Sequence, residues 1–162
     1  MKFKLILSLF LALFTCCTTA LAEPTNATEK KIEWCRLQHP GTITIEAGTR
    51  SELIYGQVFI PNCSEGEKVC KGVKAEVCIA PKDNTKSMTC FVAQNNPKFR
   101  TDTNNDEYMA EIYTVIPGEY YLLYQFSLDN GRTYIKCDFD DDAGFDFAKA
   151  GTAIVKPKET KE

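Results

Sequence analysis

The sequence predicts an all-β protein, an immunoglobulin-like antiparallel β-sandwich stapled by disulfides. Two observations lead to this fold class. Between residues 32 and 155 the apolar side chains alternate with a period of two, in short runs rich in β-branched and aromatic residues that turn residues separate. The same region holds six cysteines, enough for three bridges. A small β-barrel is the alternative architecture.

Nine segments fit short strands, because each combines apolar alternation with turn residues at its ends. They are Ile32 to Leu37, Thr42 to Ile45, Glu52 to Ile60, Val73 to Ala80, Met88 to Ala93, Tyr108 to Ile116, Glu119 to Leu128, Thr133 to Cys137 and Thr152 to Val155.

The clearest strand is Glu119 to Leu128. A proline-glycine turn precedes it and an asparagine-glycine hairpin signal follows it. One face carries Tyr120, Leu122, Tyr124 and Phe126, which we expect in the core, and the other face carries Leu123. By the same alternation, Trp34 shares the face of Ile32, so a core position is favoured over an exposed sugar-stacking ring.

The first 22 residues have the pattern of a secretory signal peptide. Lys2 and Lys4 precede an apolar stretch too short to span a bilayer, and Ala20-Leu21-Ala22 fits a cleavage site. We therefore expect a mature chain that begins at Glu23 and is secreted or periplasmic. A lipoprotein signal at Cys16 or Cys17 is disfavoured, because a smaller residue is expected directly before the lipidated cysteine.

The expected mature chain has one domain, residues 32–155, between flexible polar segments at 23–31 and 156–162. Loss of the two signal lysines from 19 basic residues leaves 17, against 22 acidic ones, so the mature chain is acidic. This balance disfavours nucleic acid as a partner. No later apolar run approaches the ~20 residues of a membrane helix, so no membrane span is expected.

Six cysteines allow 15 pairings, which strand geometry narrows. A hairpin about Lys82 to Lys86 places Cys78 opposite Cys90. Cys63 and Cys70 bracket one polar loop, which leaves Cys35 for Cys137. A metal or redox site is disfavoured, because the sequence has no Cys-x-x-Cys and its single histidine, His39, is not close to a cysteine pair.

Two acidic loops are the candidate metal site. Asp138, Asp140 and Asp142 alternate in one loop, and Asp106 lies in a second oxygen-rich loop, Asp102 to Glu107. Carboxylates so close together repel one another unless a cation screens them, and Ca²⁺ prefers oxygen ligands. Neither loop is an EF-hand. Two solvated turns, or a pair of catalytic carboxylates as in glycosidases, are the other interpretations.

Five motifs occur in a fixed order: Trp34 to Gln38, Tyr55 to Val58, Asn104 to Ala110, Tyr124 to Gly131 and Cys137 to Asp140. Together this set resembles a β-sandwich accessory module of secreted bacterial proteins, often appended to extracellular hydrolases. The resemblance implies a non-catalytic role and supplies no catalytic residues. Cys63, Cys70, Cys78 and Cys90 depart from its pattern.

The function expected from the sequence is a secreted, non-catalytic binding or adhesion module for an extracellular protein or carbohydrate. Two alternatives stay open at this point. One is a calcium-stabilised structural envelope protein, and the other is a small extracellular hydrolase that uses the acidic loops.

Overall fold

The computed structural model describes residues 30–66, 68–99, 104–140 and 144–160. The expected signal peptide, residues 1–22, lies outside the described residues. Each of the nine predicted segments contains a strand. The elements are β1 (Trp34–His39), β2 (Thr42–Glu46), β3 (Ile54–Phe59), β4 (Lys74–Pro81), β5 (Thr89–Asn95), β6 (Asp106–Ala110), β7 (Gly118–Ser127), β8 (Ile135–Cys137), the 3₁₀ turn η1 (Phe147–Lys149) and β9 (Gly151–Lys156).

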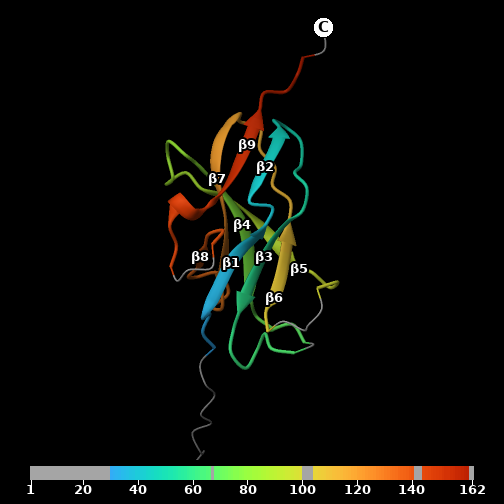
Figure 1. Cartoon of the computed structure of the whole chain (residues 1–162), viewed down its shortest axis with the longest axis vertical. Coiled ribbons are helices and arrows are strands. Elements are labelled where there is room, and N and C mark those ends of the chain that lie inside the picture. Colours follow the sequence, from blue (N-terminus) through green and yellow to red (C-terminus); the bar gives the residue numbers. More distant parts are fainter. Residues whose placement is uncertain (1–29, 67, 100–103, 141–143, 161–162) are drawn as a thin grey trace, which may run out of the picture.

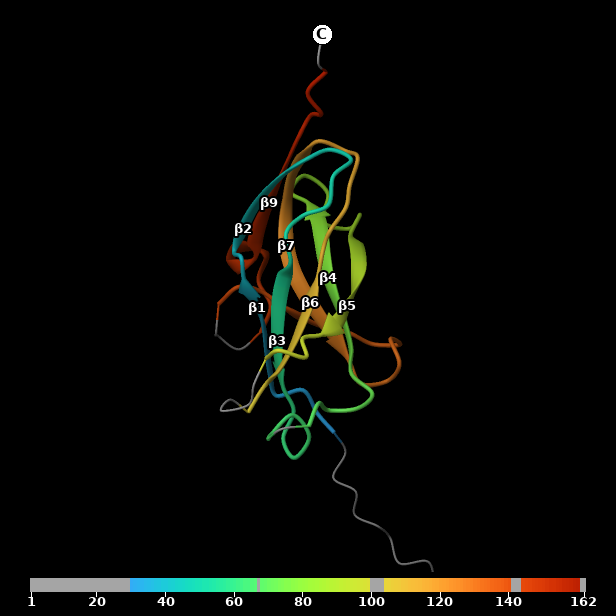
Figure 2. The same cartoon turned by 90° about the vertical axis from the view of Figure 1, so that its right-hand side faces the viewer.

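The strands form one continuous sheet in the order β1-β3-β6-β5-β4-β7-β9-β2, and β8 pairs with β7. All pairs are antiparallel except β2 with β9. The sheet bends back on itself at β5. As a result, β1, β3 and β6 face the layer formed by β4, β7, β9 and β2 (Figures 1 and 2). The all-β, disulfide-stapled prediction is confirmed, in a sheet that is nearly closed and barrel-like.

The predicted core face of β7 is confirmed. Tyr120, Leu122, Tyr124 and Phe126 all belong to the buried cluster between the layers. The Tyr124 hydroxyl lies 2.8 Å from the Ile54 carbonyl oxygen, so it links β7 to a strand of the opposite layer. Burial raises the pKa of this phenol far above its usual range, which keeps the hydroxyl a donor.

The opposite face of β7 differs from the prediction. Leu123 is also fully buried, beside its cross-strand neighbour Cys78. Trp34 differs too, because it is half-buried and outside the core cluster, with the Arg36 guanidinium 5.5 Å from its ring centroid. The core expectation for Trp34 is therefore wrong. Residues two apart on a strand share a face, and here that face carries a charged neighbour.

The predicted strand over Tyr108 to Ile116 is shorter in the structure. It ends at Ala110, and beyond it Tyr113 makes an isolated bridge to Arg50. Val115 and Ile116 are largely exposed. Their apolar character resembled a strand in the sequence, but no neighbouring strand covers them in the described part of the chain.

The three disulfides join the predicted partners. Cys35–Cys137 connects β1 to β8, Cys63–Cys70 closes the loop after β3, and Cys78–Cys90 connects β4 to β5. On the chain-entropy model, closure of the loop between Cys35 and Cys137 contributes roughly 4.7 kcal/mol. Among the described residues, no helix is long and apolar enough to cross a membrane.

Candidate functional site: an open strand edge

The first five residues of β5, 89–93, have a neighbouring strand on one side only. These residues pair with β4, whereas β6 pairs only with Gln94 and Asn95. The Cα atoms of Cys78 and Cys90 are 4.1 Å apart, the close spacing of a pair that exchanges no backbone hydrogen bonds. The N–H and C=O groups of Cys90, and of Val92 two residues on, therefore point away from β4. No described strand pairs with them.

This edge lacks the features by which proteins usually protect an exposed strand. Edge strands commonly carry lysine, proline or a bulge that discourages pairing with another chain. β5 has the sequence Thr-Cys-Phe-Val-Ala-Gln-Asn, with no charge and no proline. Val92, at its centre, is 78% exposed. Such an edge is a template for one further strand.

A hollow of about 400 Å³ lies beside this edge, and we call it the β5 groove. Its walls come from three separate parts of the chain, and they are Arg50, Leu53, Phe91, Val92, Gln94, Met109, Ala110 and Glu111. The lining is mixed, and its apolar part includes Leu53, which is 41% exposed, and the half-buried Phe91 and Met109. The groove therefore offers apolar contacts beside unpaired backbone groups.

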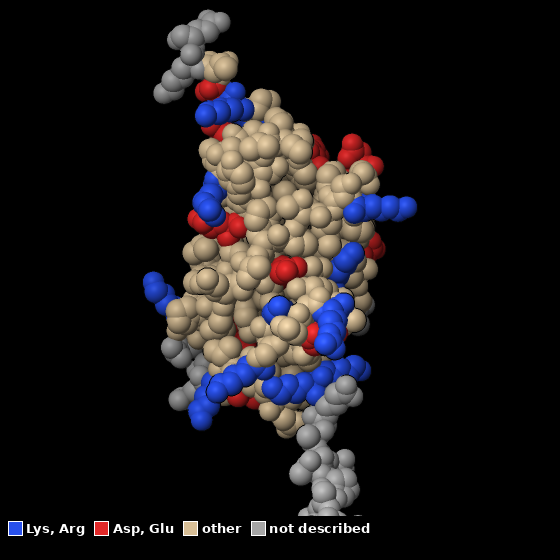
Figure 3. Space-filling model, turned by 180° about the vertical axis from the view of Figure 1, so that it is seen from behind, with Lys and Arg blue, Asp and Glu red and all other residues tan. Residues whose placement is uncertain are grey.

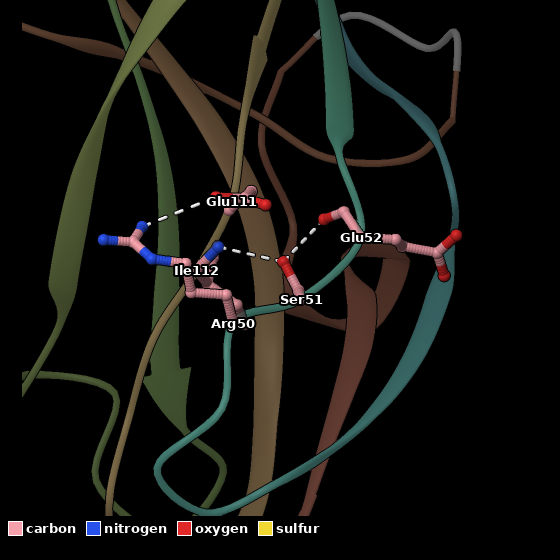
Figure 4. A network of polar contacts seen from close by, with 5 residues as sticks. All are labelled: Arg50, Ser51, Glu52, Glu111 and Ile112. Carbon is pink, nitrogen blue, oxygen red and sulfur yellow. Dashed lines mark hydrogen bonds and ion pairs between the residues drawn. The ribbon is translucent and has the colours of Figure 1, made fainter.

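A polar network holds the wall of the groove that Arg50 and Glu111 form (Figure 4). The buried Ser51 hydroxyl accepts a hydrogen bond from the Ile112 N–H at 3.0 Å and donates one to the Glu52 carbonyl oxygen at 2.6 Å. Arg50 Nη1 lies 3.4 Å from Glu111 Oε2. Because this ion pair is exposed, it contributes little stability. The serine bonds hold the segments at 50–52 and 111–112 together.

A second hollow, of about 650 Å³, lies at the start of β5, between the β4–β5 hairpin and the turn before β7. Its apolar lining includes Ile79, Ile116 and Tyr120, and Thr89 of β5 belongs to it. Lys82 Nζ and Glu119 Oε2, 3.2 Å apart, form an ion pair at this hollow. Apolar hollows thus flank both ends of the open edge.

The predicted metal ligands have partners inside the protein. The buried Asp138 carboxylate accepts the Asp146 N–H at 2.9 Å, and burial raises the pKa of Asp138. Asp140 Oδ2 lies 2.8 Å from Lys149 Nζ. Asp142 lies outside the described residues. The structure thus brings Asp138 and Asp140 close together, and calcium at this loop stays a prediction.

Asp106 lies elsewhere. It pairs with Val58, which pairs in turn with Cys35, so its backbone is roughly 10 Å from β1 by strand spacing. Its carboxylate accepts the Cys70 N–H at 2.8 Å, and burial raises its pKa. The structure does not place Asp106 beside the acidic loop that contains Asp138.

One cluster of metal-ligand types was not foreseen. Ligand atoms of Glu76, Cys78 and Cys90 lie within 4.8 Å of one another. Both sulfurs are in the Cys78–Cys90 disulfide, so neither is a thiolate that could bind a metal. Glu76 instead accepts hydrogen bonds from Gln125 and Tyr134.

Comparisons with protein-family models, with curated proteins and with solved structures find no match to this chain. The β5 groove was not predicted from the sequence. Its one local signal is the uncharged, proline-free run over Thr89 to Asn95. The remaining walls, at Leu53 and Met109, come together only through the fold.

Proposed function

We propose that this chain is a secreted, non-catalytic binding module that takes an extended segment of a protein partner as an added strand along β5. The observation that carries the proposal is the uncharged β5 edge, with the outward backbone groups of Cys90 and Val92 beside an apolar groove. In strand addition, backbone hydrogen bonds supply affinity and pockets for alternate side chains supply specificity.

The chemistry of the groove favours a protein segment over the other expected partner, a carbohydrate. Sugars bind through exposed stacked aromatic rings and dense polar contacts, whereas the one aromatic ring of the groove, Phe91, is half-buried beside the aliphatic Leu53 and Val92 and the thioether of Met109. The Arg50–Glu111 pair at the groove is neutral overall. An extended segment with alternating apolar residues fits this surface.

Two further observations support the rest of the proposal. Three disulfides favour an oxidising compartment, as expected for a secreted protein. The Tyr120 hydroxyl donates to the Ile116 carbonyl oxygen at 2.8 Å where β7 begins, as in the tyrosine corner of immunoglobulin-like sandwiches. We therefore include the immunoglobulin-like fold and the resemblance to a bacterial accessory module in the proposal.

The experiment is a selection of random peptides displayed on phage against the oxidised protein, followed by affinity measurements on two variants. Val92→Pro removes the outward N–H, a change that edge strands tolerate where this group faces solvent. Val92→Thr keeps the N–H and the branched side chain. We expect peptides with alternating apolar residues that bind the wild type and the threonine variant and lose at least tenfold affinity for the proline variant.

Equal affinity of the selected peptides for both variants would contradict strand addition at β5. Sedimentation of the unliganded protein is the companion measurement. A dimer that Val92→Pro dissociates would assign the edge to a second copy of the chain and overturn the proposal of a separate partner.

A further inference from the structure

One end of the molecule concentrates exposed basic residues. β4 begins there and β7 ends there, so the loop at 60–73, the turn at 128–134 and residues 30–33 all lie at this end. Six exposed bases come from these segments, and we call them the basic end: Lys30, Lys31, Lys68, Lys71, Lys74 and Arg132. Figure 3 shows Lys and Arg side chains gathered where the N-terminal segment leaves the fold.

The concentration is a matter of placement and not of composition. The whole chain has 19 basic and 22 acidic residues, so a random distribution would leave every surface slightly acidic. Among the described residues, the surface carboxylates of the same segments are Glu33, Glu65 and Asp129, and Glu67 of the loop at 60–73 lies outside the described residues. The six exposed bases outnumber these carboxylates, and they still do so when Glu67 is added.

Among the described residues, the bases of this end form no close ion pair. In the described part of the chain, the close ion pairs involve Arg50, Lys82 and Lys149, none of which belongs to the basic end. Lys30 Nζ donates instead to the Lys71 carbonyl oxygen at 3.2 Å, which holds two of the bases near each other. Bases that outnumber the carboxylates around them create a positive surface potential.

Lys74 and Arg132 come from neighbouring segments at the turn that follows β7. The methylene chain of Lys74 lies against Gly131, directly before Arg132. The turn itself is rigid, because the Asp129 carboxylate accepts hydrogen bonds from the N–H groups of Arg132 and Thr133, each at 2.9 Å. These bonds hold the backbone of Arg132 in place.

We infer that the basic end binds an acidic polysaccharide, a chain of repeating carboxylate or sulfate groups. Exposed bases spread over several segments suit a repeating anion better than a single small one, because each charge meets the next repeat. Nucleic acid is disfavoured, since single strands are held by bases stacked on exposed aromatic rings. The described aromatic side chains near these bases, Trp34, Phe99 and Tyr134, are all half-buried, and the Tyr134 hydroxyl is bonded to Glu76. This surface is separate from the β5 groove.

The test is calorimetric titration with sodium alginate and with heparin, a polycarboxylate and a polysulfate, at low and high salt. The test variant carries Lys71→Glu, Lys74→Glu and Arg132→Glu. The control carries Lys86→Glu, Lys156→Glu and Lys158→Glu, which make the same change in net charge with exposed residues toward the opposite end of the strands. Melting curves of both variants verify that they fold.

We expect the wild type and the control to bind at least one of the two polysaccharides within about threefold of each other, more weakly at high salt. The test variant should lose at least tenfold in affinity. Equal loss in both variants would show an effect of net charge alone and overturn the proposal. Binding of neither polysaccharide, or tighter binding of duplex DNA at the same salt, would also overturn it.

Discussion

Gly56 is a point at which the two layers of the fold touch, and its replacement by alanine tests this packing. A Cβ atom built on Gly56 would lie closer than 3.0 Å to several ring carbons of Tyr124. That ring is fully buried, and its hydroxyl lies 2.8 Å from the Ile54 carbonyl oxygen and 3.2 Å from that of Tyr108. The ring therefore has no room in which to move aside.

The expected cost of Gly56→Ala follows from overpacking, which typically destabilises a core by about 1 to 3 kcal/mol. A shift of the Tyr124 ring would also weaken its hydrogen bond, worth about 1 kcal/mol. Loss of glycine flexibility in the unfolded chain offsets about 0.4 to 1 kcal/mol. We therefore expect a net loss of about 1 to 3 kcal/mol, or roughly 4 to 12 °C in melting temperature.

Gly41→Ala is the matched control. A Cβ atom there would lie 2.8 Å from ring carbons of Phe139, also a clash though a less severe one, but the Phe139 side chain is 45% exposed and has room to rotate into solvent. We expect this variant to lose less than about 1 kcal/mol. Thermal and urea unfolding of both variants measure the difference. An equal loss in the two variants would refute the claim that the Tyr124 ring is locked between the layers.

Three more predictions concern single side chains. Leu122→Ala and Leu123→Ala should each cost about 2 to 5 kcal/mol in urea unfolding, because both side chains are fully buried; a much smaller cost at Leu123 would restore the exposed outer face expected from the sequence. Hydrogen bonds from Thr133, Ser127 and Arg132 hold the pKa of Asp129 well below its usual range, so its stabilisation is present above the unfolded pKa near 4 and is lost as the pH falls. Asp129→Asn should flatten the fall in stability at acid pH, and an unchanged acid profile would contradict this. Calcium at the acidic loop should give heat in a titration of chelator-treated protein that Asp140→Asn reduces, and no heat at millimolar calcium would leave Asp138 and Asp140 with protein partners alone.

Much of the fold follows from short-range patterns in the sequence. The alternation over residues 119–128 places Tyr124 in the core, and the spacing of turn residues locates all nine strands. The hairpin after β4 sets Cys78 opposite Cys90, as predicted. These features succeed because a strand with one buried face must repeat its apolar residues every second position.

The wrong predictions of burial share one physical cause. The alternation of apolar residues along a strand does not show which segments cover each face of that strand. Leu123 is fully buried and Trp34 only half-buried, and what covers each of these side chains was decided by the fold. The same holds for β5. Its open edge exists because β6 joins it only at Gln94 and Asn95, a pairing between strands that no local pattern encodes.

The acidic loops show a further limit of sequence reasoning. Density of carboxylates predicted a cation at Asp138, Asp140, Asp142 and Asp106, but short aspartates also accept backbone N–H groups in turns. Asp106 and Asp138 do this for Cys70 and Asp146. A sequence pattern does not separate a carboxylate that organises its own loop from one that awaits a ligand.

Amide hydrogen exchange along β5 is the measurement that tests the open edge most directly. In the free protein, the N–H groups of Phe91 and Ala93 face β4 and should exchange slowly, whereas those of Cys90 and Val92 face outward and should exchange fast. When a selected peptide binds, exchange at Cys90 and Val92 should slow at least tenfold. Slow exchange at all four amides of the free protein, or no protection at Cys90 and Val92 in the peptide complex, would contradict strand addition at β5.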